Sequence, residues 1–362
     1  MLLRKVGLTN VRSRRALEVG LGPGLTILVG PNGAGKTTVL EAAALVLQGS
    51  MLRPGTIRDL IRRSEDFLRV EVELLEAGTT TVAAAAHSRA GERRLTADGA
   101  PLDDASRWQG LLPVRTFVPD DLRLIKGSPR RRREYLDSLA GRRDPAYPGI
   151  LRRYGEALSQ RNTLLRAMRG GDQDRQFSPW ESILAQTGLA VSRRREAALA
   201  AFVGVFQRTH ADLTGEAVDA LRLVYRTNVA GLDETEYRSR LAQTRDVDRQ
   251  RTYTHLGPHR DDLRLTCRDL DVRDCASQGE QRAALLALVL AEWDYSCGPS
   301  QCSSQRPLLL LDDVMSELDE DRRRALVALL RRGGQAVITT TELRYFSPEE
   351  LADATVVELS PE

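Results

Sequence analysis

Lysine is almost absent from this chain of 362 residues, in which nearly every basic residue is arginine. Lysine occurs only as Lys5, Lys36 and Lys126. Coding bias is a sufficient cause of this preference for arginine. Because lysine is so rare here, a lysine at a position where chemistry requires one is more informative than usual. The net charge is only +3. Overall charge alone therefore does not predict binding to nucleic acid, and the distribution of the charges matters more.

Long apolar runs are also missing. No segment approaches the roughly 18 consecutive apolar residues that a membrane-spanning helix needs. The first residues lack the basic, then apolar, then small-residue order of a signal peptide. We therefore expect a cytoplasmic protein with no membrane partner.

Cysteine is scarce and lies in the last third of the chain, as Cys267, Cys275, Cys297 and Cys302. The spacings fit no zinc pattern well. Cys297 and Cys302 could form a loose ligand pair, but no histidine or second close pair accompanies them. We expect free thiols in a reducing compartment.

Hydrophobic periodicity predicts an α/β chain with a helical insertion. The stretch from Ser128 to Arg245 is helical and arginine-rich, and α/β character returns from about Gly257. We expect one discontinuous α/β domain made of residues 1–125 and 250–362 and an inserted helical lobe at 126–249. The expected strands are Leu2–Leu8, Arg15–Val19, Leu25–Val29, Phe67–Leu75, Thr80–His87, Val114–Val118, Pro307–Leu311 and Ala336–Thr340. The expected helices are Lys36–Leu47, Tyr154–Met168, Trp180–His210, Ser277–Trp293 and Glu320–Arg332.

A complete phosphate-binding motif follows the third strand and opens the first helix. It matches G-x-x-x-x-G-K-[ST] and consists of Gly30, Pro31, Asn32, Gly33, Ala34, Gly35, Lys36 and Thr37. Its glycines let backbone N–H groups surround an anion at the start of a helix. Lys36 is expected at the β- and γ-phosphates of ATP, the Thr37 hydroxyl on Mg²⁺, and Thr38 beside them.

Two carboxylates end a strand that contains four leucines. Such an apolar run suits a central strand covered on both faces. Its end would place Asp312 beside the phosphates, where it can hold Mg²⁺ directly or through water. Asp313 would then orient the attacking water, as a candidate general base. Two acidic residues at a strand end are common by chance, and the complete phosphate-binding loop gives them this meaning.

A second anion-binding sequence lies about 30 residues before the acidic strand. Ser277, Gln278, Gly279 and Glu280 precede an apolar helix, whose start is expected to bind an anion. The segment alone is better explained by a capped helix, with Ser277 and Glu280 as a capping box. The order of elements favours the functional interpretation, because Ser316-Glu317-Leu318-Asp319 follows the acidic strand.

These four motifs, in this order, resemble those of the ABC ATPase superfamily. The resemblance implies an ABC-type P-loop ATPase head, with a mixed sheet and helices, that works as an ATP-dependent homodimer. Ser277, Gln278 and Gly279 would contact the γ-phosphate held by the other protomer, and Ser277 would act there in trans. Asp319 would lie where the protomers meet.

Further segments resemble RecF in particular. Asn10-Val11-Arg12-Ser13 and Glu41-Ala42 are similar to segments of the DNA-maintenance ATPases SMC, Rad50 and RecF. The segments most similar to RecF are Phe117–Leu122, Lys126–Pro129 with the arginines that follow, Gln160–Leu165 and Thr254–Asp262. The resemblance implies a recombinational repair protein that dimerises on DNA with ATP. It would hydrolyse ATP slowly, as a weak DNA-dependent ATPase and switch, and load RecA at single-strand gaps and junctions with RecO and RecR.

Two positions depart from the superfamily. Asp313 stands where most ABC proteins have glutamate, and Thr340-Thr341 where transporters have a histidine, so rapid hydrolysis is not expected. A glutamine of the Q-loop cannot be placed near Phe117. The alternatives are the ATPase subunit of a transporter, an SMC-like structural ATPase with long heptad arms, and a regulatory ATP switch that binds proteins and not DNA.

Single- and double-stranded DNA is the remaining expected partner. The candidate phosphate contacts are Lys126, Arg130, Arg131, Arg132 and Arg133, since arginine suits phosphate oxygens. The plain alternative is a solvated helix face whose arginines pair with nearby acids. His255 and His259 flank a Gly-Pro turn and are expected to pack the loop, with no chemistry assigned to them.

Overall fold

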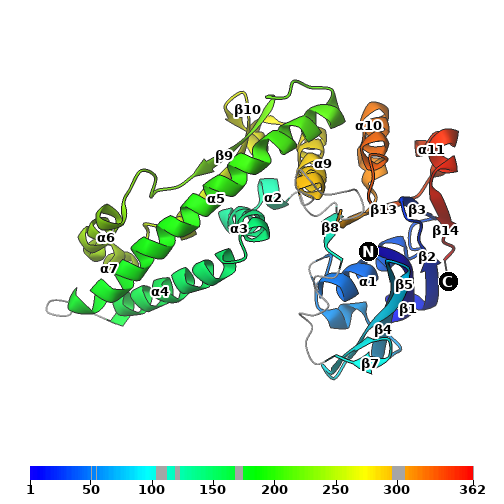
Figure 1. Cartoon of the computed structure of the whole chain (residues 1–362), viewed down its shortest axis with the longest axis horizontal. Helices are drawn as coiled ribbons and strands as arrows, with labels where there is room; N and C mark the ends of the chain where they lie inside the picture. Colours follow the sequence, from blue (N-terminus) through cyan, green and yellow to red (C-terminus); the bar gives the residue numbers. More distant parts are fainter. Residues whose placement is uncertain are drawn as a thin grey trace. The chain divides into compact units, whose positions relative to one another are not determined.

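The computed structural model describes residues 1–49, 51–53, 55–102, 112–118, 123–167, 174–295 and 306–361. The chain divides into two compact units. The first holds residues 1–121, 208–217 and 277–362, and the second holds 122–207 and 218–276. Figure 1 labels their helices and strands.

Five short strands form a parallel sheet in the first unit, in the order β14-β3-β13-β12-β8. All neighbouring pairs are parallel, so the carboxyl ends of the strands share one edge. Every residue of the three central strands is buried, which is why their sequences are mainly apolar, with β-branched threonine at the few polar positions. The strands are β3 (Leu25–Val29), β8 (Val114–Phe117), β12 (Leu308–Leu311), β13 (Ala336–Thr340) and β14 (Thr355–Glu358).

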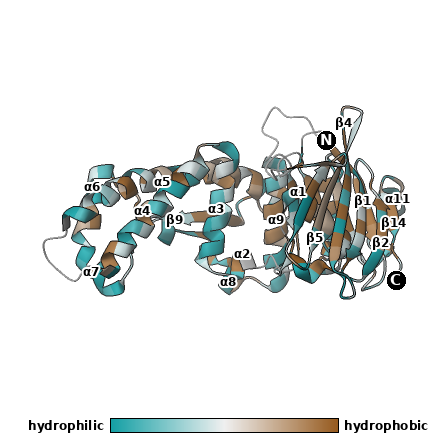
Figure 2. Cartoon of the chain, turned by 90° about the horizontal axis from the view of Figure 1, so that it is seen from below, coloured by the Kyte–Doolittle hydropathy of each residue, from teal (hydrophilic) through white to brown (hydrophobic). Residues whose placement is uncertain are grey.

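Six antiparallel strands form a second sheet in the same unit, in the order β2-β1-β4-β5-β6-β7. Burial alternates along β4, as it does when only one face of a sheet is packed. The same alternation is visible as hydrophobic and hydrophilic colours along these strands (Figure 2). The strands are β1 (Leu2–Val11), β2 (Arg14–Gly20), β4 (Phe67–Glu76), β5 (Thr79–Ser88), β6 (Arg93–Ala97) and β7 (Ala100–Pro101).

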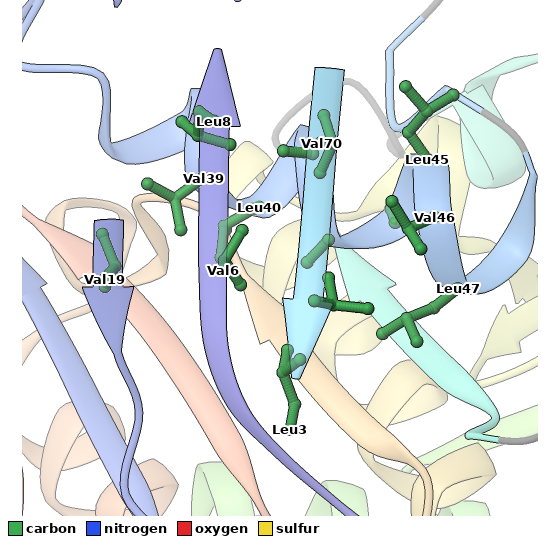
Figure 3. Packing of buried hydrophobic residues seen from close by; sticks show 14 of the residues in the cluster. Leu3, Val6, Leu8, Val19, Val39, Leu40, Leu45, Val46, Leu47 and Val70 are labelled. Atoms are coloured by element: carbon green, nitrogen blue, oxygen red, sulfur yellow. The ribbon is translucent and has the colours of Figure 1, made fainter. Parts of the chain in front are cut away.

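Helix α1 (Lys36–Gln48) lies in the core between the two sheets. Figure 3 shows Val39 and Leu40 of this helix beside Val6 and Leu8 of β1. The same apolar cluster includes residues of the parallel sheet, among them Leu310. The helix that follows the phosphate-binding loop is therefore held on both sides.

The first unit contains further short and long helices. They are the 3-10 helices Ile57–Leu60, Val314–Glu317 and Leu343–Tyr345 and the α-helices α9 (Gln278–Tyr295), α10 (Glu320–Leu330) and α11 (Pro348–Ala352). None of the helices in the described ranges combines the length and apolar character needed to cross a lipid bilayer.

The second unit is mainly helical but contains a small sheet that the sequence analysis missed, in the order β11-β10-β9. Its helices are α2 (Arg123–Lys126), α3 (Pro129–Arg143), α4 (Tyr147–Ala167), α5 (Phe177–Thr214, whose end from 208 belongs to the first unit), α6 (Glu234–Gln243), α7 (Arg245–Arg251), α8 (Val272–Cys275) and the 3-10 helices Asp174–Gln176 and Pro258–Arg260. Its strands are β9 (Leu221–Arg226), β10 (Asp262–Cys267) and β11 (Leu270–Asp271).

The division of the chain differs from the expected one in this sheet. The second unit extends to Ala276, past the boundary expected at residue 249. The physical reason is strand pairing, because β10 is hydrogen-bonded along its whole length to β9. A helical pattern could not reveal this, since the two strands are separated by two helices in sequence.

Buried arginines hold the second unit together. Arg161 of α4 is fully buried and donates to Asp248 at 2.6 Å, to Glu181 at 3.2 Å and to the Leu241 carbonyl at 2.7 Å. Arg195 of α5 is also buried, and its guanidinium contacts Asp137 at 2.8 Å and Asp261 at 3.2 Å. Such charges are tolerated inside a protein only when they are paired and hydrogen-bonded.

Of the four cysteines, Cys267 and Cys275 are reduced rather than joined in a disulfide, as expected. Cys297 and Cys302 lie outside the described residues, and so does part of the segment Phe117–Leu122.

Candidate functional site

The phosphate-binding loop connects the carboxyl end of β3 to the first turn of α1. Gly33 and Gly35 have φ angles of +84° and +78°, which favour glycine. A Cβ atom on Gly30 would lie 2.2 Å from the Leu359 carbonyl oxygen, so this position has no room for a side chain. The loop therefore needs its glycines for two reasons, backbone conformation and close approach of a neighbouring chain segment.

Lys36 folds back over its own loop. Its Nζ donates to the carbonyl oxygens of Gly30 at 2.6 Å and of Pro31 at 3.0 Å. Burial lowers the pKa of this ammonium, while Asp313 and Asp312 act in the opposite direction. The lysine thus lies at the loop with two carboxylates nearby, in the position from which it could contact a bound phosphate.

Asp312 is the centre of the site. It follows β12 and is nearly fully buried. Its Oδ1 accepts from the Thr37 hydroxyl at 2.8 Å and from the Thr339 hydroxyl at 2.9 Å, and its Oδ2 accepts from Arg53 at 2.5 Å. The structure therefore brings together Thr37 and Asp312, which lie 275 residues apart, as the sequence predicts for a shared metal site.

The residues present fit Mg²⁺. A hydroxyl and a carboxylate oxygen are hard ligands, and magnesium proteins commonly supply only one or two such groups and leave the rest to water and phosphate. The Arg53 guanidinium contacts the same carboxylate, which shows that this carboxylate attracts a cation. No group of three or more acidic, histidine or cysteine side chains that could hold a metal occurs in the described part of the chain.

Asp313 has a strained backbone. Its φ is +47°, in the left-handed region, which is uncommon for a residue with a side chain. Its backbone N–H donates to the Thr339 hydroxyl at 2.8 Å. Its Oδ1 is buried and has no hydrogen-bond partner among the residues that the structure describes. A buried carboxylate oxygen of this kind is available to a water molecule or ligand.

These side chains line one cavity of about 420 Å³. Its lining residues are Arg12, Ser13, Asn32, Gly33, Gly35, Lys36, Thr37, Thr38, Glu41, Arg53, Asp312, Asp313 and Thr339. The lining is polar and carries both basic and acidic groups, as a magnesium–nucleotide site requires.

Several of the residues that line this cavity were not predicted from the sequence to belong to the site. Arg53 lies in a segment with no recognisable motif, and Thr339 carried no signal beyond its strand end. Arg12 and Glu41 were noted only as points of resemblance. The structure joins them by a two-pronged ion pair, with Arg12 Nη2 2.9 Å and Nε 3.2 Å from the two carboxylate oxygens of Glu41.

The second anion-binding segment lies at the start of α9. Ser277 and Glu280 form the capping box that the sequence predicts: the Ser277 N–H donates to the Glu280 carboxylate at 2.6 Å, and the Glu280 N–H donates to the Ser277 Oγ at 3.3 Å. Within the described residues, none of positions 277–279 lines the cavity at the phosphate-binding loop. One chain alone therefore leaves Gly279 and its neighbours away from their expected ligand.

Asp319 caps a second helix. Its carboxylate accepts from the Arg322 N–H at 2.9 Å at the start of α10, and its side chain is 58% exposed. Arg282 of α9 forms an ion pair with Glu317. The two segments that are expected to meet another protomer are thus joined to each other.

The arginine run divides into exposed and buried members. Arg132 is buried and binds the Asp262 carboxylate through two hydrogen bonds of 2.7 and 3.1 Å. Arg133 is half-buried and donates to the Asp261 carbonyl at 2.9 Å. Burial and the ion pair with Asp262 do not favour Arg132 as a DNA contact, and the Arg133 guanidinium is only partly accessible.

Lys126, Arg130 and Arg131 are exposed and remain candidates for contacts with DNA phosphates. Arg130 pairs with Glu134 at 2.8 Å, but both groups are well exposed, and such pairs contribute little. These three residues are free to turn toward a phosphate.

The Thr254–Asp262 segment is held from inside. Both His259 nitrogens are hydrogen-bonded, to the Tyr154 hydroxyl at 2.6 Å and to the Thr254 carbonyl at 2.8 Å. His255 contacts Asp248. Both histidines therefore pack the loop, as the sequence predicts.

Comparison with known proteins places the chain in a family. Residues 2–356 match the family model described as the RecF/RecN/SMC N terminal domain. The chain is 36% identical to a "DNA replication and repair protein RecF" of Heliobacterium modesticaldum, over 98% of this chain and 96% of that protein. It is 35% identical to a protein of the same name from Herpetosiphon aurantiacus, over 98% and 97% of the two chains.

Solved structures agree. A structure described as RecF with ATP in the RecFOR pathway matches with a TM-score of 0.78 and 26% identity, over 95% of this chain and 93% of that chain. An SMC head bound to the winged-helix domain of ScpA matches with a TM-score of 0.58 at 17% identity, and so shares the ABC-type ATPase fold. Together these matches show that the chain belongs to the RecF family.

Proposed function

We propose that this chain is an ATP-dependent DNA repair protein that dimerises when ATP binds and holds DNA in that state. The observation that supports it most directly is the buried Asp312 carboxylate, 2.8 Å from the Thr37 hydroxyl beside the phosphate-binding loop. The ATP complex described for a RecF structure supports the choice of nucleotide.

Nucleotide binding would rearrange the hydrogen bonds of the loop. Lys36 would leave the carbonyls of Gly30 and Pro31 and donate to the β- and γ-phosphates. Thr37 and Asp312 would hold Mg²⁺, which neutralises phosphate charge when bound. Arg53 would then give up its contact with Asp312, because one carboxylate would have to serve both cations.

Dimerisation would complete the site. The start of α9 would present the Ser277 hydroxyl and the Gly279 N–H to the γ-phosphate of a second copy of the chain. The absence of positions 277–279 from the cavity lining, among the described residues, supports a contact in trans. Asp313 would orient the attacking water, and its aspartate in place of a longer glutamate suits slow, DNA-dependent turnover.

DNA would be held through backbone phosphates by Lys126, Arg130 and Arg131. The proposed DNA is gapped, with junctions of single and double strands, and the proposed task is to help RecO and RecR load RecA there. The RecFOR pathway named for the related structures supports these partners.

Sedimentation velocity with and without ATP and Mg²⁺ tests the proposal. We expect a monomer without ATP and a dimer with it. Ser277→Ala should bind nucleotide and remain monomeric, whereas Lys36→Arg should keep some binding and lose turnover, because a planar guanidinium cannot replace a compact ammonium. A dimer that is indifferent to ATP would refute the mechanism.

Fluorescence anisotropy tests DNA binding on gapped and duplex DNA, with and without ATP. Affinity should fall steeply between about 50 and about 200 mM salt, since each phosphate contact adds roughly one unit to the slope of log affinity against log salt. Arg131→Ala should reduce that slope. Salt-independent binding, or none, would favour the protein-binding switch.

A further inference from the structure

Arg322 lies in the first turn of α10, three residues after the capping residue Asp319. Its backbone N–H is capped by the Asp319 carboxylate at 2.9 Å. Its Nε lies 3.5 Å from the other oxygen of the same carboxylate, and the side chain is 21% exposed. The guanidinium is therefore held near the surface, with limited freedom.

This guanidinium faces the start of α9. A Cβ atom on Gly279 would lie 3.7 Å from Arg322 Nη1. Apart from the adjacent residues and the backbone of the same helix, no other atom of the described residues would lie within 4 Å of it. The space above Gly279 is thus open except for this cation. A group that enters this space beside Gly279 comes within reach of Arg322.

A phosphate at the start of α9 would be repelled by the Glu280 carboxylate. Glu280 lies in the first turn of α9, and hydrogen bonds from Ser277 hold the pKa of its carboxyl below the usual range, with the Arg322 charge acting in the same direction. An ionised carboxylate at the start of α9 repels phosphate and opposes the attraction of the helix terminus. The Ser277 Oγ accepts from the Glu280 N–H, and its hydroxyl also interacts with the Glu280 carboxylate, so a phosphate would compete with that carboxylate for the hydroxyl proton.

We propose that Arg322 is a further cation of the shared nucleotide site, offsetting Glu280 and facing the γ-phosphate of the second copy together with Ser277 and Gly279. The inference rests on the proposed function. It gives the site a positive side chain that neither the phosphate-binding loop nor the α9 segment supplies in trans.

The test measures ATP-dependent dimerisation of the full chain by sedimentation velocity, beside binding of a fluorescent ATP analogue. Arg322→Gln should bind the analogue normally and dimerise at least about tenfold more weakly, the scale of losing one charge at an interface. Arg322→Lys should recover most of the loss. Arg324→Gln is the matched control, because Arg324 lies on the same helix, pairs with Glu320 and is expected to leave dimerisation unchanged.

Glu280→Gln separates electrostatics from folding. Glutamine also completes a capping box, so the start of α9 is preserved. Adding it to Arg322→Gln should restore part of the dimerisation, which a purely structural role of Arg322 would not allow. Arg322→Gln dimers as tight as the wild type, or no recovery in the double variant, overturn the inference. A wild-type chain that stays monomeric with ATP overturns the proposed function, and the inference with it.

Discussion

His259 should make this protein sensitive to mild acid. Its Nε2 lies 2.8 Å from the Thr254 carbonyl, which can only accept, so Nε2 carries the proton. Nδ1 then accepts from the Tyr154 hydroxyl at 2.6 Å. The fold therefore selects one neutral form of the ring.

Burial, with smaller contributions from neighbouring Arg260 and Arg133, lowers the pKa of His259 from 6.5 to about 4. The unfolded chain takes up a proton below pH 6.5 that the folded chain refuses, so stability falls as pH falls through this range and levels off below about pH 4. Between pH 7.5 and pH 5.0 this single group should cost about 2 kcal/mol of unfolding free energy.

Urea unfolding at these two pH values measures the effect. His259→Gln retains a donor and an acceptor but does not titrate, so its stability should vary with pH by about 2 kcal/mol less than that of the wild type. With only four histidines in the chain, imidazole NMR signals can be assigned by substitution. A His259 signal that titrates near pH 6.5, or equal pH dependence in both proteins, would refute the reasoning.

Three further predictions concern packing and chemistry. Arg161→Met should destabilise the second unit by about 3–5 kcal/mol in urea unfolding, because it removes the guanidinium that neutralises the buried Asp248 carboxylate. Gly257→Ala should lower the melting temperature strongly, because φ is +135° and the new Cβ would lie 2.4 Å from the Tyr154 hydroxyl. Asp312→Asn should bind nucleotide but lose Mg²⁺-dependent phosphate release by about 100-fold or more, since a metal ligand is lost.

The two packing predictions each have a control. Gly20→Ala introduces a Cβ with nothing within 4 Å, so it should change the melting temperature little. Arg152→Met removes an arginine that is 79% exposed and should be nearly neutral. Equal losses in Arg161→Met and Arg152→Met would contradict the role given to the buried ion pairs, and full turnover in Asp312→Asn would contradict the metal site.

Much of the site could be predicted because its motifs are contiguous. The run from Gly30 to Thr37 contains both the glycines that the turn needs and the lysine that follows. Ser277 and Glu280 are three residues apart, so a capping box is readable from local sequence. Strands such as Leu25–Val29 and Ala336–Thr340 were predicted to the residue, because short runs of apolar and β-branched residues suit buried parallel strands.

Prediction failed where distant segments compete for one side chain. The arginines at 130–133 look alike in sequence. Arg132 is nevertheless buried, because the carboxylate of Asp262, 130 residues away, accepts its hydrogen bond. Arg53 gave no signal, since only folding brings it to Asp312, 259 residues along the chain. The small sheet was missed because each of its strands lies among helices.

The sequence by itself therefore determined the chemistry that can be built from neighbours along the chain: the phosphate loop, the acidic strand end and the capped helix start. Only the tertiary structure decided which charged side chains are buried in ion pairs and which remain accessible to a ligand. The reason is that local backbone geometry depends on a few adjacent residues, whereas burial and ion pairing depend on which distant segments pack together.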